Sequence, residues 1–223
     1  MADWILGPQD EIYTVLILHP RVFELSATEL LTYRANTAFR TEDPTINFSI
    51  ELSEEVSGLA YIVLHETTHI VDYVERHTPF VEPSMLELFG RSDRDSAFTD
   101  EVWSSYRELA PSISFGYQED LRFYEFGGDP AFSNHEIPRI LKALADTPFG
   151  SLYGSISWAE DFAEYVSFYY LVHSLGAQYT IRVERNDHLL YEYKPMQSPG
   201  VMDRVRFIDP ALLRAPESKS DRN

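Results

Sequence analysis

The most constraining feature of the sequence is the pentapeptide His65-Glu66-Thr67-Thr68-His69, which lies in the longest apolar-periodic segment of the first half. In an α-helix, residues four positions apart lie one turn apart on the same side, so His65 and His69 would point the same way. Two imidazoles in this arrangement can bind one zinc ion, and Glu66 can reach a metal-bound water and take its proton. The pattern requires a helix at this position and a third metal ligand elsewhere.

The flanking residues predict one long helix around the motif. Ser53 or Ser57 can act as its N-cap, and Thr78-Pro79 ends it, so the helix should reach about His77. Its apolar face consists of Leu59, Ile62, Val63, Ile70, Val71 and Val74. Both motif histidines then fall in the middle of the helix.

A second predicted helix, residues 157–175, carries a pair of carboxylates on one face. Glu160 and Glu164 are four positions apart, so one can bind the metal while the other accepts the ring N–H of a ligand histidine. Two alternatives remain open: Ser157 and Glu160 match a capping box, and Glu164 can lie on a solvated face. The five other histidines and the remaining carboxylates also stay candidates for the third ligand.

These motifs together resemble those of gluzincin metallopeptidases of the anthrax lethal factor and Pro-Pro endopeptidase type. Two blocks carry the resemblance: His65-Glu66-x-x-His69-x-Val71-Asp72-Tyr73, and Tyr153-Gly154 followed after four residues by Ala159-Glu160-x-Phe162-Ala163-Glu164. The resemblance covers little else, and the interval between the blocks is longer than the family leads us to expect. We expect that helical insert to contribute to the shape of a substrate cleft.

The resemblance implies a zinc cofactor with three protein ligands, His65, His69 and Glu160. It also implies that Glu66 is the general base on a zinc-bound water, that Tyr153 stabilises the oxyanion, and that Glu164 supports a ligand histidine. The function it implies is a zinc-dependent metalloendopeptidase acting on a peptide or protein substrate. The alternatives are a non-catalytic zincin scaffold, in which zinc stabilises a binding or assembly protein, and a chain without metal in which the histidines occur by chance.

Asp72 has two interpretations. It lies three positions after His69, where it can support the ligand, and four positions before Arg76, where it can form a helix salt bridge.

The remaining patterns predict an α+β fold. Strands are predicted at residues 11–18, 45–52, 179–183 and 189–193, the first of them buried and the last two flanking a hairpin signal at Asn186-Asp187. Further helices are predicted at residues 26–39, 85–89, 100–109 and 134–145, with residues 117–126 either helix or strand. Strand 45–52 is either a substrate-binding edge strand or an ordinary strand of the sheet.

A single zincin-like domain should span residues 1–215. We expect an N-terminal lobe at about 1–79, with a small sheet and the zinc-motif helix, packed against a mainly helical lobe at about 80–178. A C-terminal hairpin should follow at about 179–208, and residues 216–223 should form a disordered tail.

Composition limits the partners. With Asp+Glu 36 against Lys+Arg 18, the net charge of −18 should repel nucleic acid and anionic lipid. The absence of cysteine excludes disulfides, thiolate zinc sites and a cysteine nucleophile. No segment approaches the roughly 18 apolar residues of a membrane span. Met1-Ala2-Asp3-Trp4 shows no signal-peptide features, so a cytoplasmic location is expected, or an extracytoplasmic one if the chain is trimmed.

Overall fold

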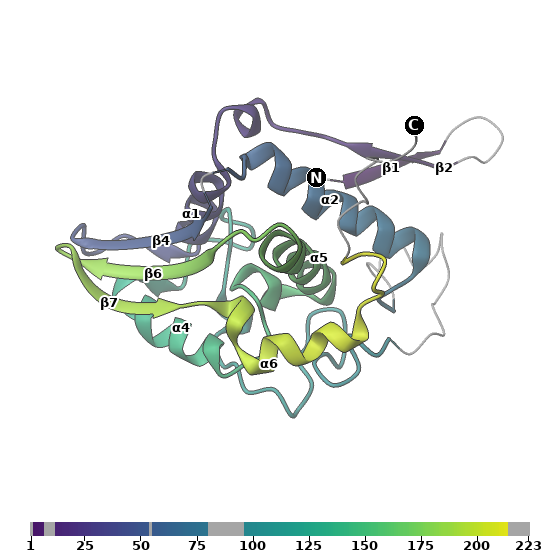
Figure 1. The fold of residues 1–223 in the computed structure, drawn as a ribbon. Helices are drawn as coiled ribbons and strands as arrows, with labels where there is room; N and C mark the ends of the chain where they lie inside the picture. Colours follow the sequence, from purple (N-terminus) through teal and green to yellow (C-terminus); the bar gives the residue numbers. More distant parts are fainter. Residues whose placement is uncertain (1, 7–11, 54, 80–95, 214–223) are drawn as a thin grey trace.

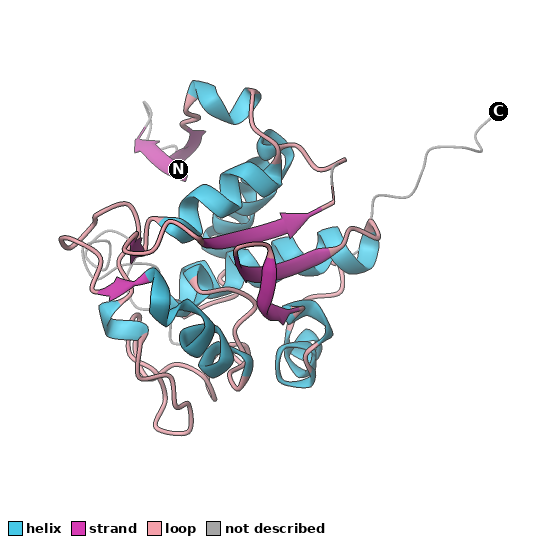
Figure 2. Cartoon of the chain, turned by 90° about the vertical axis from the view of Figure 1, so that its left-hand side faces the viewer, coloured by secondary structure: helices cyan, strands magenta, loops and turns pink. Residues whose placement is uncertain are grey.

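The structure is a computed structural model that describes residues 2–6, 12–53, 55–79 and 96–213. Helices and small sheets are mixed along this chain, which is the α+β class that the sequence predicts (Figure 1; Figure 2). Within the described residues, no helix is both long and apolar enough to cross a membrane.

The main sheet has three antiparallel strands in the order β4-β6-β7. Its strands are β4 (Ile46–Leu52), β6 (Tyr179–Arg185) and β7 (His188–Tyr193). Asn186 and Asp187 connect β6 to β7 with positive φ angles of 49° and 62°, as the hairpin signal predicts. The predicted C-terminal hairpin thus joins β4, a strand of the N-terminal half, in one sheet (Figure 1).

Two smaller sheets accompany the main one. β1 (Ala2–Leu6) pairs with β2 (Ile12–Leu16) in an antiparallel hairpin, and β3 (Phe39–Arg40) pairs in parallel with β5 (Phe132–Ser133). The prediction that strand 11–18 is buried is wrong: none of residues 13–18 is buried, and Tyr13 and Ile17 are 52% and 57% exposed.

The helices are α1 (Ala27–Asn36), α2 (Gly58–Glu75), α4 (Ile137–Ala145), α5 (Trp158–Tyr169) and the short α6 (Pro199–Met202). Of these, α1, α2 and α5 begin directly after a serine that the sequence offers as a capping residue. Ser26 forms the predicted capping box with Glu29 at the start of α1. Ser57 and Ser157 are the N-caps of α2 and α5, and α5 continues into a π-helical turn, Tyr170–Ser174.

The outer edge of β4 is covered by side chains of α1. Thr28 Oγ1 accepts from Leu52 N at 2.9 Å and donates to Leu52 O at 2.7 Å. Thr32 Oγ1 repeats both bonds at Ile50, and Asn36 Nδ2 donates to the carbonyl two residues earlier in the strand. The α1 residues are four positions apart, which is a rise of about 6 Å, and their partners on β4 are two positions apart, which is about 6.7 Å. Because these two spacings are nearly equal, the contact repeats along both elements. At these positions β4 offers no free edge to a substrate strand, which argues against that hypothesis.

Part of the predicted helical lobe is irregular. Residues 100–109 form turns rather than the predicted helix, because Ser104 Oγ bonds to the carbonyls of Glu108 and Leu109 and thereby competes with helical bonding, while Trp103 is buried. Within residues 117–126 only the 3₁₀ turn Gln118–Asp120 forms, and no strand. The description of the lobe as mainly helical is therefore wrong for residues 96–133, whereas the predicted helix 85–89 and tail 216–223 lie outside the described residues.

One hydrophobic core runs through the described chain. Leu31 of α1, Phe48 of β4, Phe162 of α5 and Val183 of β6 all belong to it. α2 packs against α5 (Figure 1). Tyr61 of α2 stacks on Phe168 of α5 inside this core. The contact between these two helices fixes the relative positions of the two sequence motifs.

Candidate metal centre

His65, His69 and Glu160 meet where α2 packs on α5. The Nε2 atoms of the two histidines are 3.2 Å apart, and Glu160 Oε2 lies 3.2 Å from His65 Nε2 and 3.5 Å from His69 Nε2. Ligand atoms bound at about 2.1 Å to a tetrahedral metal ion lie about 3.4 Å apart. The group could therefore hold a metal ion with its side chains in their present positions.

The chemistry of the three atoms also fits a metal ion. His65 Nδ1 lies 3.1 Å from Glu164 Oε1. When the Nδ1 proton is directed at this carboxylate, Nε2 can offer its lone pair to a metal ion. That lone pair faces Glu160 Oε2, which is buried and accepts no hydrogen bond from the described residues. Acceptor atoms this close repel one another unless a proton or a metal cation lies between them.

The site opens to solvent on one side. Glu160 and His69 are 21% and 20% exposed, whereas His65 is only 4% exposed. A water or a substrate atom can therefore approach from the side of Glu160 and His69, which a catalytic metal site with a free fourth position requires.

Neighbouring charges shift the ionisation of the metal-free cluster. Burial lowers the pKa of His65, but Glu160 and Glu164 outweigh burial and raise this pKa to about 9. Burial raises the pKa of Glu160, but the nearby imidazoles of His69 and His65 hold it well below its usual range. Without metal, the cluster therefore retains a proton that shields the facing lone pairs.

Glu164 connects the candidate ligand His65 to three further side chains. Its Oε1 faces His65 Nδ1 and also accepts a hydrogen bond from the Tyr61 hydroxyl. Its Oε2 accepts from Arg34 Nη2 and from Ser151 Oγ, both at 2.7 Å. Burial raises the pKa of Glu164, but the charge of Arg34 and the contact with His65 lower it to about 2, so the carboxylate is ionised. Glu164 is 1% exposed, which rules out the solvated-face interpretation.

Tyr153 lies beside Glu160 on a 3₁₀ turn, Tyr153–Ile156, just before α5. Its hydroxyl donates to Glu160 Oε1 at 3.5 Å, and its ring packs edge-on against Phe123 at 5.1 Å. The next residue, Gly154, donates its N–H to Ser151 Oγ at 2.9 Å, and a Cβ there would lie 3.3 Å from the same oxygen. The close approach explains why a Tyr-Gly pair suits this turn.

Glu160 lies beside both histidines, as the sequence predicts. Glu66 is half-buried and follows His65 on α2, about 100° further around the helix. Ser157 caps α5 by accepting from Glu160 N at 3.3 Å, while the Glu160 carboxylate turns to the histidines. The cap and the metal-ligand interpretations are thus compatible.

Asp72 has a different partner from both of its predicted ones. Its two carboxylate oxygens accept from Thr78 N at 2.7 Å and from Thr78 Oγ1 at 2.8 Å. Among the described residues it forms no ion pair with Arg76 and no hydrogen bond to His69. Asp72 fixes the chain as it leaves α2, where Arg76 has a left-handed φ of 59°.

Three residues that no sequence motif predicts also contact Glu164: Arg34, Tyr61 and Ser151. Arg34 gives the clearest signal, because it lies within the buried stripe of α1 that Leu31 and Ala35 define. A charged residue in such a stripe needs a buried partner. Tyr61 precedes His65 by one turn on the same face of α2, so helical periodicity also places it near the site.

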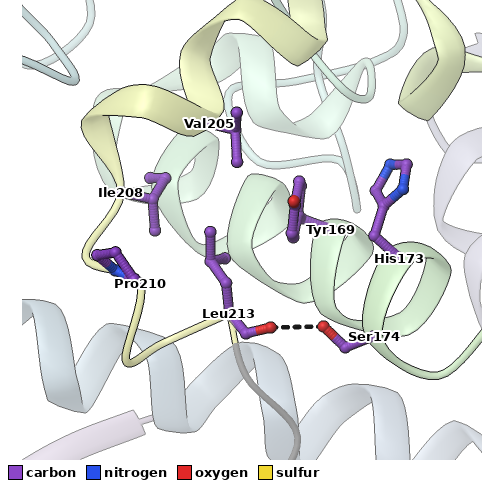
Figure 3. A pocket seen from close by; sticks show the side chains of 7 residues that line it. All are labelled: Tyr169, His173, Ser174, Val205, Ile208, Pro210 and Leu213. Atoms are coloured by element: carbon purple, nitrogen blue, oxygen red, sulfur yellow. Dashed lines mark hydrogen bonds between the residues drawn. The ribbon is translucent and has the colours of Figure 1, made fainter.

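Two cavities lie away from the candidate metal centre. One, of about 330 Å³, is lined by Tyr169, His173, Ser174, Val205, Ile208, Pro210 and Leu213 (Figure 3). Ser174 Oγ donates to the Leu213 carbonyl at its rim (Figure 3). A second, of about 720 Å³, is lined in part by Arg204, Arg206 and Phe207. Neither contains a residue of the metal centre, so they do not contribute to the chemistry described here.

Comparison with known proteins found no matching family model, no similar curated protein and no similar solved structure.

Proposed function

We propose that this chain is a zinc-dependent metalloendopeptidase with a zincin-like, gluzincin-type site. The observation that carries the proposal is the triangle of His65 Nε2, His69 Nε2 and Glu160 Oε2, with edges of 3.2 to 3.5 Å. Two imidazoles and one carboxylate with an open fourth position are the ligand set of catalytic zinc. Thiolate sites are excluded because the chain has no cysteine.

When bound, zinc polarises a substrate carbonyl and lowers the pKa of a water in the open position. In the proposed reaction Glu66 takes a proton from the attacking water and later gives it to the leaving amine. Tyr153 donates a hydrogen bond to the carbonyl oxygen as that oxygen gains negative charge. Burial raises the pKa of Tyr153, so its hydroxyl keeps the proton that it donates. Such a donor contributes roughly 3 kcal/mol to the transition state.

The substrate class follows from charge and from the covered sheet edge. The net charge of −18 favours basic or neutral peptide segments over acidic ones. Because Thr28 and Thr32 occupy the backbone groups at the edge of β4, a peptide must bind through other groups there.

Metal analysis and a cleavage assay test this function together. We expect one zinc per purified chain by mass spectrometry of the metals, and cleavage of a peptide library that a chelator abolishes and added zinc restores. Zinc without cleavage of any library member would favour the non-catalytic scaffold instead. If the chain bound no zinc at physiological zinc concentrations, both the peptidase and the scaffold hypotheses would be wrong.

A further inference from the structure

We propose that Arg34 is a positioning residue of the metal centre. Through Glu164 it orients His65 so that Nε2 faces the metal, and through its contact with the Tyr153 ring it holds that phenol beside Glu160. This inference rests on the proposed zinc site, and no sequence motif marks Arg34.

Arg34 makes its contacts from α1, a helix that contributes no metal ligand. It is 5% exposed, and its Nη2 donates to Glu164 Oε2 at 2.7 Å across 130 residues of sequence. Its guanidinium carbon lies 4.2 Å from the centre of the Tyr153 ring and 5.6 Å from that of the Tyr61 ring. The guanidinium of Arg34 thus contacts both Glu164, which supports the candidate ligand His65, and Tyr153, the proposed oxyanion donor.

The two oxygens of Glu164 have different partners, and Arg34 determines which faces His65. Arg34 and Ser151 both bind Oε2, so Oε1 remains for His65 Nδ1 and the Tyr61 hydroxyl. A carboxylate that accepts the Nδ1 proton fixes the tautomer and the plane of a ligand imidazole. Loss of Arg34 would free Glu164 to rotate and would leave a buried carboxylate without its cation.

Arg204 offers a matched control for a purely structural ion pair. Arg204 Nη2 lies 2.7 Å from Asp161 Oδ2, with side-chain exposures of 4% and 1%, against 6% and 1% for Arg34 and Glu164. Its guanidinium also lies over an aromatic ring, that of Phe98, at 3.7 Å. Asp161 belongs to α5, as Glu164 does, but its partners are Arg204 and Trp103 rather than a metal ligand.

The experiment compares zinc affinity in the wild type and in Arg34→Met, Arg34→Lys and Arg204→Met. Affinity is measured by competition with a chromophoric chelator, fold stability by thermal unfolding, and ligand geometry by the visible spectrum of the cobalt(II)-substituted protein. We expect Arg34→Met to weaken zinc binding about 10- to 100-fold and to change the cobalt spectrum, as loss of such support does at other metal sites. Arg34→Lys should recover part of the affinity because it restores the charge.

Arg204→Met should lower the unfolding temperature while leaving zinc affinity and the cobalt spectrum unchanged. Equal zinc affinity in Arg34→Met and wild type, or an equal loss in Arg34→Met and Arg204→Met, would overturn the inference. If Arg34→Met does not fold, Arg34→Gln provides the same comparison with a neutral donor. Failure of the wild type to bind zinc would instead refute the proposed function, and the inference with it.

Discussion

The Nε2 atoms of His65 and His69 lie 3.2 Å apart, and the planes of their rings meet at 88°. Glu160 Oε2 faces both nitrogens, so three atoms from two helices that could bind a metal ion share one small space. Such an arrangement is stable only with a cation among the three atoms. Metal binding should therefore displace the proton that the metal-free cluster retains and should tie α2 to α5.

Glu160→Ala should abolish zinc binding, because it removes the ligand that α5 contributes. The measurement is zinc content after dialysis, together with zinc affinity by chelator competition. Asp161→Asn is the control: it alters the next carboxylate of the same helix, which binds Arg204 instead, and the folded protein should retain zinc. Normal zinc binding by Glu160→Ala would show that the ligand assignment is wrong.

Glu66→Ala should keep zinc and lose turnover. Glu66 is not one of the three candidate metal ligands, so its loss should not affect zinc binding. Removal of a general base typically lowers kcat by about 10²- to 10⁴-fold. Zinc content and kcat are measured on the same preparation. Thr67→Ala, at the neighbouring exposed position of α2, should retain both. Comparable turnover in Glu66→Ala and Thr67→Ala would exclude Glu66 as the base.

The sequence predicts well which side chains meet at the candidate metal centre, because much of the information is local. Helical periodicity aligns His65 with His69, and the N-caps Ser57 and Ser157 fix where α2 and α5 begin. The choice of Glu160 as the third candidate ligand required the resemblance as well as the helix pattern, because many carboxylates compete for that role.

Long-range contacts explain what the sequence analysis missed. Arg34 and Tyr61 reach Glu164 across 130 and 103 residues of sequence, and no periodicity encodes such pairs. The helix predicted at residues 100–109 does not form, and tertiary contacts explain this difference as well. Burial of Trp103 and the side-chain bonds of Ser104 favour turns over the helix that local composition predicts.

Tyr153→Phe should lower kcat by roughly 100-fold and leave zinc affinity nearly unchanged. The hydroxyl contacts Glu160 Oε1 at 3.5 Å, not the oxygen that faces the histidines, and one lost donor to a developing oxyanion corresponds to roughly 3 kcal/mol. Steady-state kinetics should show the loss in kcat rather than in KM. A change confined to KM would assign Tyr153 to substrate binding.

Thr32→Val should destabilise the fold by about 1 to 3 kcal/mol without changing zinc stoichiometry. The substitution removes the hydroxyl that bonds both the N–H and the carbonyl of Ile50, and leaves these backbone groups unpaired at the edge of β4. Urea unfolding measures the loss of free energy. Thr67→Val makes the same change at an exposed helical position and should cost much less. If Thr32→Val and Thr67→Val lost the same unfolding free energy, the hydrogen bonds of Thr32 to Ile50 would contribute nothing, and the loss would reflect only the lower helix propensity of valine.

Asp43 should give the fold a pH dependence that is independent of metal. Hydrogen bonds from Thr45, and then the contact with Arg185, lower the pKa of Asp43 from 3.8 to about 2. Since this pKa is lower in the folded chain, the stabilisation is complete above about pH 3.8 and is lost as the pH falls towards 2. Asp43→Asn should therefore destabilise the metal-free protein above pH 4 and flatten its stability between pH 4 and 2, as measured by urea unfolding across that range. If the variant and the wild type lost stability in parallel over this interval, the lowered pKa of Asp43 would not be the source of the slope.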